Sequence, residues 1–147
     1  MKKLLAGLFL VMAAAVGAQE VLSGYGEPEY ESDLDWAQVR YVVAQETREG
    51  VWRFAVSVEH NDQGWDHYAN IWQVVHPETL EVYGTRELLH PHDDEQPFIR
   101  SQAGIAIPPD VDKVLVRAAC NVHDYSGGAV LVDLNAASGE LFEVERR

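Results

Sequence analysis

Apolar and polar residues alternate along much of the chain with a period of two. In the clearest run, Trp52, Phe54, Val56 and Val58 are separated by more polar or smaller residues. This is the pattern of a β-strand with one buried face, whereas a helix would scatter these four side chains around its axis. The alternation therefore predicts a strand over residues 52–58.

Similar patterns or β-rich apolar runs recur between turn-forming residues. We expect further strands at residues 39–44, 68–75, 80–86, 98–107, 113–122 and 129–134, with residues 140–144 as a short edge strand or tail. Gly104 interrupts one of these runs and predicts a β-bulge. No helix of ten residues or more is predicted beyond residue 18.

Seven or eight short strands with turns every eight to twelve residues or so are typical of an all-β domain. We therefore predict an antiparallel Ig-like or fibronectin-III-like β-sandwich, with Trp52, Phe54, Trp72 and Phe98 in its core. A small closed barrel is the alternative architecture.

The amino terminus has the charged, apolar and small-residue order of a secretory signal peptide. Two lysines precede an apolar run over residues 4–16, and small residues lead to a cleavage position after Ala18. We therefore divide the chain into a signal peptide (1–18), an acidic extended leader (19–35) and a β-sandwich domain (36–147).

These features predict a periplasmic or secreted protein. The first mature residue is Gln19, whereas a bacterial lipid anchor would need a cysteine there, so we expect no anchor. No segment approaches the ~20 apolar residues of a membrane span.

The net charge of −13 disfavours nucleic acid and favours cations or basic proteins as partners. Cys120 is the one cysteine, so an internal disulfide is impossible.

The polar loops contain the candidate chemistry. If consecutive strands run antiparallel, the loops over residues 60–67, 87–97 and 123–128 share one end of the sandwich. They hold five of the six histidines, and only His76 falls at the other end. Acidic residues and the aromatic residues Trp65, Tyr68 and Tyr125 accompany these histidines in the sequence.

The sequence His90-Pro91-His92 places two imidazoles on one side of an extended backbone. With His67 or His123 as a third ligand and Asp94 or Glu95 available, this pair could bind zinc or copper, which both accept imidazole. The predicted metal ligands are His67, His90, His92 and His123. Alternatively, these histidines are solvated or anchor their loops through hydrogen bonds.

The segment Cys120-Asn121-Val122-His123 resembles the cupredoxins, a family of copper-binding β-sandwiches, in having a cysteine at a strand end and a histidine in the following loop. The resemblance implies Cys120, His123 and one of His67, His76 or His90 as copper ligands. However, both methionines lie within residues 1–18, so the usual axial ligand is missing. Cys120 is also in phase with the apolar residues of its strand, which favours a buried structural thiol.

Two other groupings favour structural interpretations. Ser126, His123 and Asp124 have the residue types of a hydrolytic triad, but neighbouring residues do not form that relay by adjacency, and a hairpin turn explains them better. The acidic run over residues 93–95 lacks a calcium-loop spacing and is interpreted as solvated.

Four segments, at residues 64–69, 89–92, 95–98 and 122–125, resemble a group of small exported bacterial proteins without an established activity. The resemblance covers Val51 to Leu134 and implies an Ig-like sandwich in which these segments belong to one module. It implies no function.

We therefore predict an exported β-sandwich whose histidine-rich loops bind a transition metal or another small ligand. The alternative is a protein-interaction or adhesion module in which the histidines are structural or respond to pH. A hydrolase is less favoured, because the sequence contains no clear nucleophile.

Overall fold

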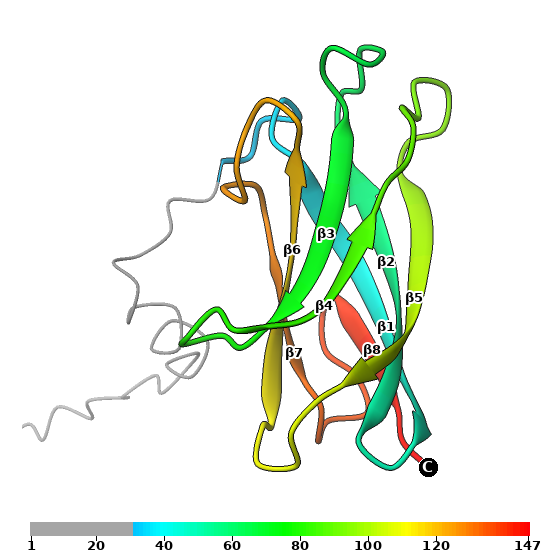
Figure 1. The fold of residues 1–147 in the computed structure, drawn as a ribbon, viewed down its shortest axis with the longest axis vertical. Coiled ribbons are helices and arrows are strands. Elements are labelled where there is room, and N and C mark those ends of the chain that lie inside the picture. The colour runs from blue at the N-terminus through cyan, green and yellow to red at the C-terminus, as the bar shows by residue number, and fades with distance from the viewer. Residues whose placement is uncertain (1–30) are drawn as a thin grey trace, which may run out of the picture.

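The computed structural model describes residues 31–147, which form eight β-strands (Figure 1). The strands are β1 (Gln38–Arg48), β2 (Val51–Glu59), β3 (Ala69–Val75), β4 (Val82–Glu87), β5 (Phe98–Ala106), β6 (Lys113–Cys120), β7 (Val130–Asp133) and β8 (Phe142–Glu145). The predicted all-β sandwich is confirmed. The predicted signal peptide and the leader as far as residue 30 lie outside the described residues.

The strands form two four-stranded sheets. One sheet has the order β5-β2-β1-β8 and the other has the order β4-β3-β6-β7. Neighbouring strands are antiparallel, except that β8 pairs with β1 in parallel. Among the described residues, no helix is long and apolar enough to cross a membrane.

The core lies between the two sheets and follows the alternation of the sequence. In β2, every second residue from Trp52 to Val58 is buried. The largest fully buried side chains include the aromatic residues predicted for the core, Trp52, Phe54, Trp72 and Phe98. Burial of these side chains supplies the main force that holds the sheets together.

Two irregularities adjust which residues face the core. The predicted bulge at Gly104 is confirmed, because its φ is +73° and β5 contributes an extra residue between the partners of Trp52 and Phe54. A second bulge lies in β1 between Val39 and Tyr41. It changes the phase of the strand, so that Val42 is fully buried.

The loops between β2 and β3, β4 and β5, and β6 and β7 meet at one end of the sandwich (Figure 1). The amide of Asn121 donates to the carbonyl oxygen of Tyr68 at 3.1 Å, and the amide of Gly64 donates to Asp93 at 2.9 Å. The predicted convergence of these loops is therefore confirmed. We call this region, formed by residues 31–37, 60–68, 88–97 and 121–129, the loop end.

Replacing Phe54 by alanine tests the packing of the core. Phe54 is fully buried, so we expect Phe54→Ala to lower the free energy of unfolding by roughly 3–5 kcal/mol in urea denaturation. The matched control is Ile99→Ala on the neighbouring strand β5, where the side chain is 60% exposed and the loss should stay below about 1 kcal/mol. Equal losses for both variants would contradict the assigned core.

A cysteine and histidine cluster as candidate metal site

Cys120, next to the loop end, is the centre of a group of side chains of the types that bind metals. It is the last residue of β6, and it is only 5% exposed. Its Sγ lies 3.4 Å from Nε2 of His67 and 3.3 Å from Nδ1 of His123. The backbone amide of His123 also donates to Sγ, at 3.0 Å. The thiol therefore faces two imidazole nitrogens and one amide donor.

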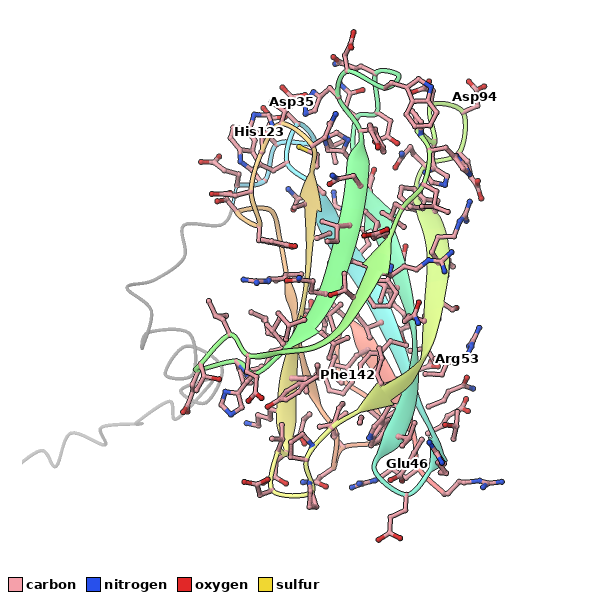
Figure 2. All side chains as sticks on the ribbon, viewed as in Figure 1. Asp35, Glu46, Arg53, Asp94, His123 and Phe142 are labelled. Carbon is pink, nitrogen blue, oxygen red and sulfur yellow. The ribbon has the colours of Figure 1, made fainter. Side chains whose placement is uncertain are left out.

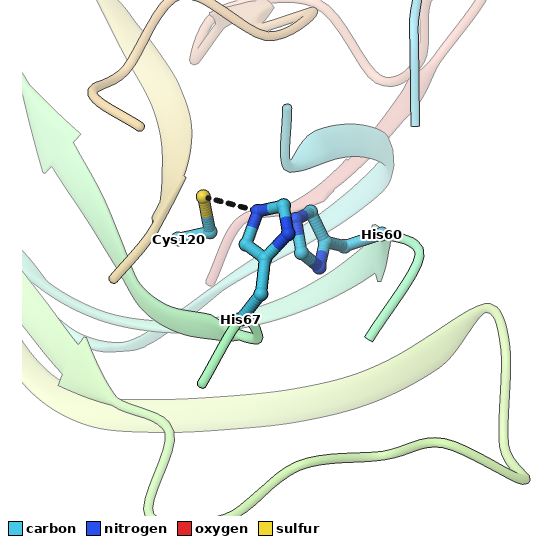
Figure 3. A group of neighbouring side chains, drawn as sticks. All are labelled: His60, His67 and Cys120. Atoms are coloured by element: carbon cyan, nitrogen blue, oxygen red, sulfur yellow. Dashed lines mark hydrogen bonds between the residues drawn. The ribbon is translucent and has the colours of Figure 1, made fainter. Parts of the chain in front are cut away.

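His60 completes the group from the end of β2. His60, His67 and Cys120 each offer one ligand atom, and these atoms all lie within 4.8 Å of one another (Figure 3). The rings of His60 and His67 are 4.7 Å apart and nearly perpendicular. We call His60, His67, Cys120 and His123 the Cys–His cluster.

A buried carboxylate fixes the orientation of His60. The side chain of Asp62 has no solvent exposure, and its Oδ1 lies 2.6 Å from Nδ1 of His60. The same oxygen accepts the amide of Ala69 at 2.9 Å, and Oδ2 accepts the amide of His92 at 2.7 Å. A charged carboxylate uses Nδ1–H of His60 as a donor, which leaves Nε2 as the nitrogen that could bind a metal.

These contacts also decide the charge of Asp62. Burial raises its pKa, but the hydrogen bonds from His60 and from the amides of Ala69 and His92 lower it by more, so the pKa lies below its ordinary value. The carboxylate is therefore charged at neutral pH although it is enclosed by protein.

The segment before β1 packs over the Cys–His cluster. The backbone oxygen of Asp35 lies 3.0 Å from Nε2 of His60 and 3.7 Å from Sγ of Cys120. The ring of Trp36 lies against that of His123, with centroids 4.3 Å apart. Figure 2 labels Asp35 and His123 near each other at the loop end, with Glu46 at the opposite end. Residues 31–35, assigned to the leader from sequence, therefore contact the domain here.

The four histidines predicted as ligands divide into two groups. His67 and His123 lie beside Cys120, with ring centroids 5.1 Å apart. His90 and His92 form a second pair, with ring centroids 4.4 Å apart. Asp62 connects the Cys–His cluster to this second pair, because one of its oxygens lies beside Nδ1 of His60 and the other accepts the amide of His92.

His92 is tied into the fold by its surroundings. Its ring stacks on Phe98 at 3.8 Å, and its Nε2 accepts a hydrogen bond from Arg100 at 2.8 Å. Burial, followed by the positive charge of Arg100 and the neighbouring His90, lowers the pKa of His92. Its Nε2 is thus engaged by a guanidinium. His90 is exposed, and its Nδ1 lies 2.9 Å from the oxygen of Pro91.

The remaining histidine, His76, lies in the loop between β3 and β4, outside the loop end. Its Nδ1 accepts the amides of Glu78 and Thr79 at 3.0 and 3.1 Å. Of the three histidines that the cupredoxin resemblance offered beside Cys120 and His123, His67 is the one in contact with the thiol.

His60 lies in one of the polar loops expected from the sequence, but it is not among the predicted ligands. A signal was present, because His60 continues the alternation of Trp52, Phe54, Val56 and Val58 and should therefore point inward. Asp35 contributes a backbone atom, for which side-chain identity gives no signal. Cys120 was weighed both as a copper ligand and as a structural thiol, and burial alone does not decide between them.

The chain is similar in sequence to a known protein. A protein of Halomicrobium mukohataei described as a "putative lipoprotein" is 39% identical over 110 residues, which are 74% of this chain and 52% of the relative. The chain thus spans about half the length of that relative. No family model and no solved structure matches the chain.

Replacing Asp62 by asparagine tests the buried hydrogen-bond network. Asparagine keeps the shape but loses the charge, so we expect Asp62→Asn to lower the free energy of unfolding by about 3 kcal/mol at neutral pH. Because the pKa is lowered in the folded protein, the contribution of Asp62 is complete above its ordinary value of 3.8 and is lost as the pH falls through the lower folded value. The fall in the free energy of unfolding that protonation of Asp62 causes at low pH should therefore be absent in Asp62→Asn.

Urea unfolding of the metal-free protein at several pH values measures both effects. The control is Asp94→Asn, which changes an exposed carboxylate of the loop between β4 and β5. If the two variants lost equally little stability, the network around Asp62 would not have the importance assigned to it.

Proposed function

We propose that this protein binds a transition metal ion, zinc or copper, at the Cys–His cluster. The observation that carries the proposal is the convergence of one ligand atom each from His60, His67 and Cys120 within 4.8 Å. His123, whose Nδ1 is 3.3 Å from the thiol sulfur, lies beside these three residues. Two of these residues, His67 and His123, were already candidates from the sequence.

The chemistry of the donors supports these metals. Thiolate sulfur and imidazole nitrogen suit zinc and copper, whereas calcium and magnesium prefer sets of oxygen ligands. With a Zn–S bond of about 2.3 Å and Zn–N bonds of about 2.0–2.1 Å, neighbouring sulfur and nitrogen ligands of a tetrahedral ion lie about 3.6 Å apart. The sulfur-to-nitrogen distances to His67 and His123 are 3.4 and 3.3 Å.

The environment of His60 supports the same proposal. Histidine ligands commonly donate their second ring nitrogen to a carboxylate, which orients the ring and makes the other nitrogen a better donor. Asp62 is placed to do this, because its Oδ1 lies 2.6 Å from Nδ1 of His60. The exposed acidic residues of the chain, whose net charge is −13, would also raise the local concentration of cations.

We further propose that the protein acts outside the cytoplasm, in the periplasm or as a secreted protein. The signal-peptide pattern of residues 1–18 supports export. The description of the relative as a lipoprotein agrees with export, since lipoproteins are carried out of the cytoplasm.

A second candidate is a module that binds a basic partner protein at the loop end. Residues 31–37, 60–68, 88–97 and 121–129 contain no lysine or arginine. Three large apolar side chains are exposed there: Trp65 at 65%, Leu89 at 72% and Val122 at 58%. An exposed tryptophan within a region of one charge sign favours contacts with a protein of the opposite sign.

Isothermal titration with Zn²⁺ and Cu²⁺ tests metal binding. We expect saturable binding of one ion per chain with a Kd in the micromolar range or below. Loss of an outer-shell residue typically weakens binding about 10–100-fold, so loss of a ligand in Cys120→Ser or His67→Ala should weaken it by at least ~100-fold.

Two histidine variants serve as matched controls. His90→Ala changes the second histidine pair, and His76→Ala changes a histidine outside the loop end. Both should bind the ions as the unmodified protein does. A large loss in His90→Ala with none in His67→Ala would move the site to the second pair, and an absence of saturable binding would end the proposal.

A further inference from the structure

We propose that the backbone carbonyl oxygen of Asp35 is an additional ligand of the metal in the Cys–His cluster. The bound ion is then a divalent cation, Zn²⁺ or Cu²⁺, rather than Cu⁺. This inference rests on the proposed function and extends the site to residues 31–37, which we call the covering segment.

The position of the Asp35 oxygen relative to two other donors is the first argument. It lies 3.0 Å from Nε2 of His60 and 3.7 Å from Sγ of Cys120. With bonds of about 2.0–2.2 Å to oxygen and nitrogen and about 2.3 Å to sulfur, ligands at 90–109° around one ion are separated by about 2.9–3.4 Å for oxygen and nitrogen and about 3.1–3.7 Å for oxygen and sulfur. The oxygen therefore has the spacing of a fellow ligand.

The hydrogen-bond partners of His60 give the second argument. Its Nδ1 faces the carboxylate of Asp62, and its Nε2 faces the carbonyl of Asp35. Both partners are acceptors, so a neutral imidazole, which has only one N–H, can donate to only one of them. An imidazolium would donate to both, whereas an ion beside Nε2 would let the imidazole lone pair and the carbonyl oxygen both bind the ion while Nδ1–H stays with Asp62.

The side chain of Gln38 holds the covering segment in place. Gln38 is 3% exposed, and its Nε2 lies within hydrogen-bond distance of the backbone oxygens of Glu31, Asp33 and Trp36, at 2.7, 3.1 and 3.1 Å. Its Oε1 accepts the amide of Gly128 at 2.7 Å. One buried amide therefore joins the covering segment to the loop between β6 and β7.

Two further contacts hold the covering segment on the loop between β2 and β3 and on the loop between β6 and β7. The amide of Asn61, next to His60, donates to the oxygen of Leu34 at 2.8 Å. Gly127 allows a close approach, since a Cβ there would lie 1.9 Å from the oxygen of Ala37. The Asp35 oxygen is thus held at the cluster without a metal, which reduces the entropy cost of using it as a ligand.

The oxygen also narrows the choice of ion. A carbonyl oxygen is a hard donor, whereas Cu⁺ selects soft thiolate and thioether ligands. A set of sulfur, nitrogen and oxygen donors suits Zn²⁺ or Cu²⁺ better than it suits Cu⁺.

Hydrogen exchange with and without Zn²⁺ tests the proposal on the unmodified protein. If Asp35 binds the ion, exchange of the amides in residues 34–38 should slow on loading by at least about 10-fold, because a metal bond ties down the covering segment. Faster exchange of these amides on loading would mean that the ion displaces the Asp35 carbonyl. Unchanged exchange would mean that the ion does not contact this carbonyl. Either result would overturn the inference while metal binding itself stood.

Gln38→Ala supplies a second, affinity-based test. Loosening the covering segment should weaken Zn²⁺ binding by roughly 10-fold, with a smaller effect on Cu⁺. It should also alter the visible spectrum of the Co²⁺-loaded protein, which reports the number of ligands. The control is Gln73→Ala. Gln73 lies in the sheet that does not contain Gln38, and its side-chain oxygen accepts a hydrogen bond from Arg117 of the same sheet, so its loss should leave binding unchanged.

The outcomes separate the inference from the function it rests on. Equal Zn²⁺ affinity and equal Co²⁺ spectra in Gln38→Ala and the unmodified protein would contradict Asp35 as a ligand. A preference for Cu⁺ over Zn²⁺ would contradict the choice of ion. Failure of the unmodified protein to bind any of these ions would instead refute the metal site itself.

Discussion

The structure of the loop end depends on the hydrogen bonds that satisfy the buried carboxylate of Asp62. A charged group without solvent contact is costly unless donors surround it. Here the donors come from the end of β2, the start of β3 and the loop between β4 and β5, through His60, Ala69 and His92. One side chain therefore fastens three segments together and, in the same contact, orients a histidine toward Cys120.

The sandwich supplies the rigid frame for this arrangement. Its two sheets bury a core of aromatic and β-branched residues, and antiparallel strands bring every second loop to the same end. Residues as distant in sequence as His67 and Cys120 consequently come within 3.4 Å of each other. Cys120 belongs to β6 itself and His60 directly follows β2, so these two side chains are held close to the packed core, which would suit the proposed metal site.

Much of this fold follows from the alternation in the sequence. The eight segments, the core aromatics and the bulge at Gly104 were predictable, because period-two burial and the conformational freedom of glycine are local properties. Which residues of β1 face the core was not predictable, because the bulge after Val39 depends on pairing with β2 rather than on any residue in β1. The convergence of the histidine loops was predictable from the order of the strands alone.

The composition of the site was predictable only in part. His67 and His123 could be proposed from their loops, but the pattern His90-Pro91-His92 drew attention to a pair whose second ring is held by Phe98 and Arg100. The proposed roles of His60 and Asp62 depend on side-chain contacts across the loop end, and the proposed role of Asp35 depends on a backbone oxygen. These are three-dimensional properties that residue spacing does not encode.

The most direct test of the proposed metal centre is the X-ray absorption spectrum of the protein loaded with one equivalent of Zn²⁺. We expect a single sulfur neighbour at about 2.3 Å together with nitrogen or oxygen neighbours at about 2.0–2.1 Å, with the outer-shell scattering of histidine rings. A spectrum that contains only light neighbours and no sulfur would place the ion away from Cys120 and contradict the account.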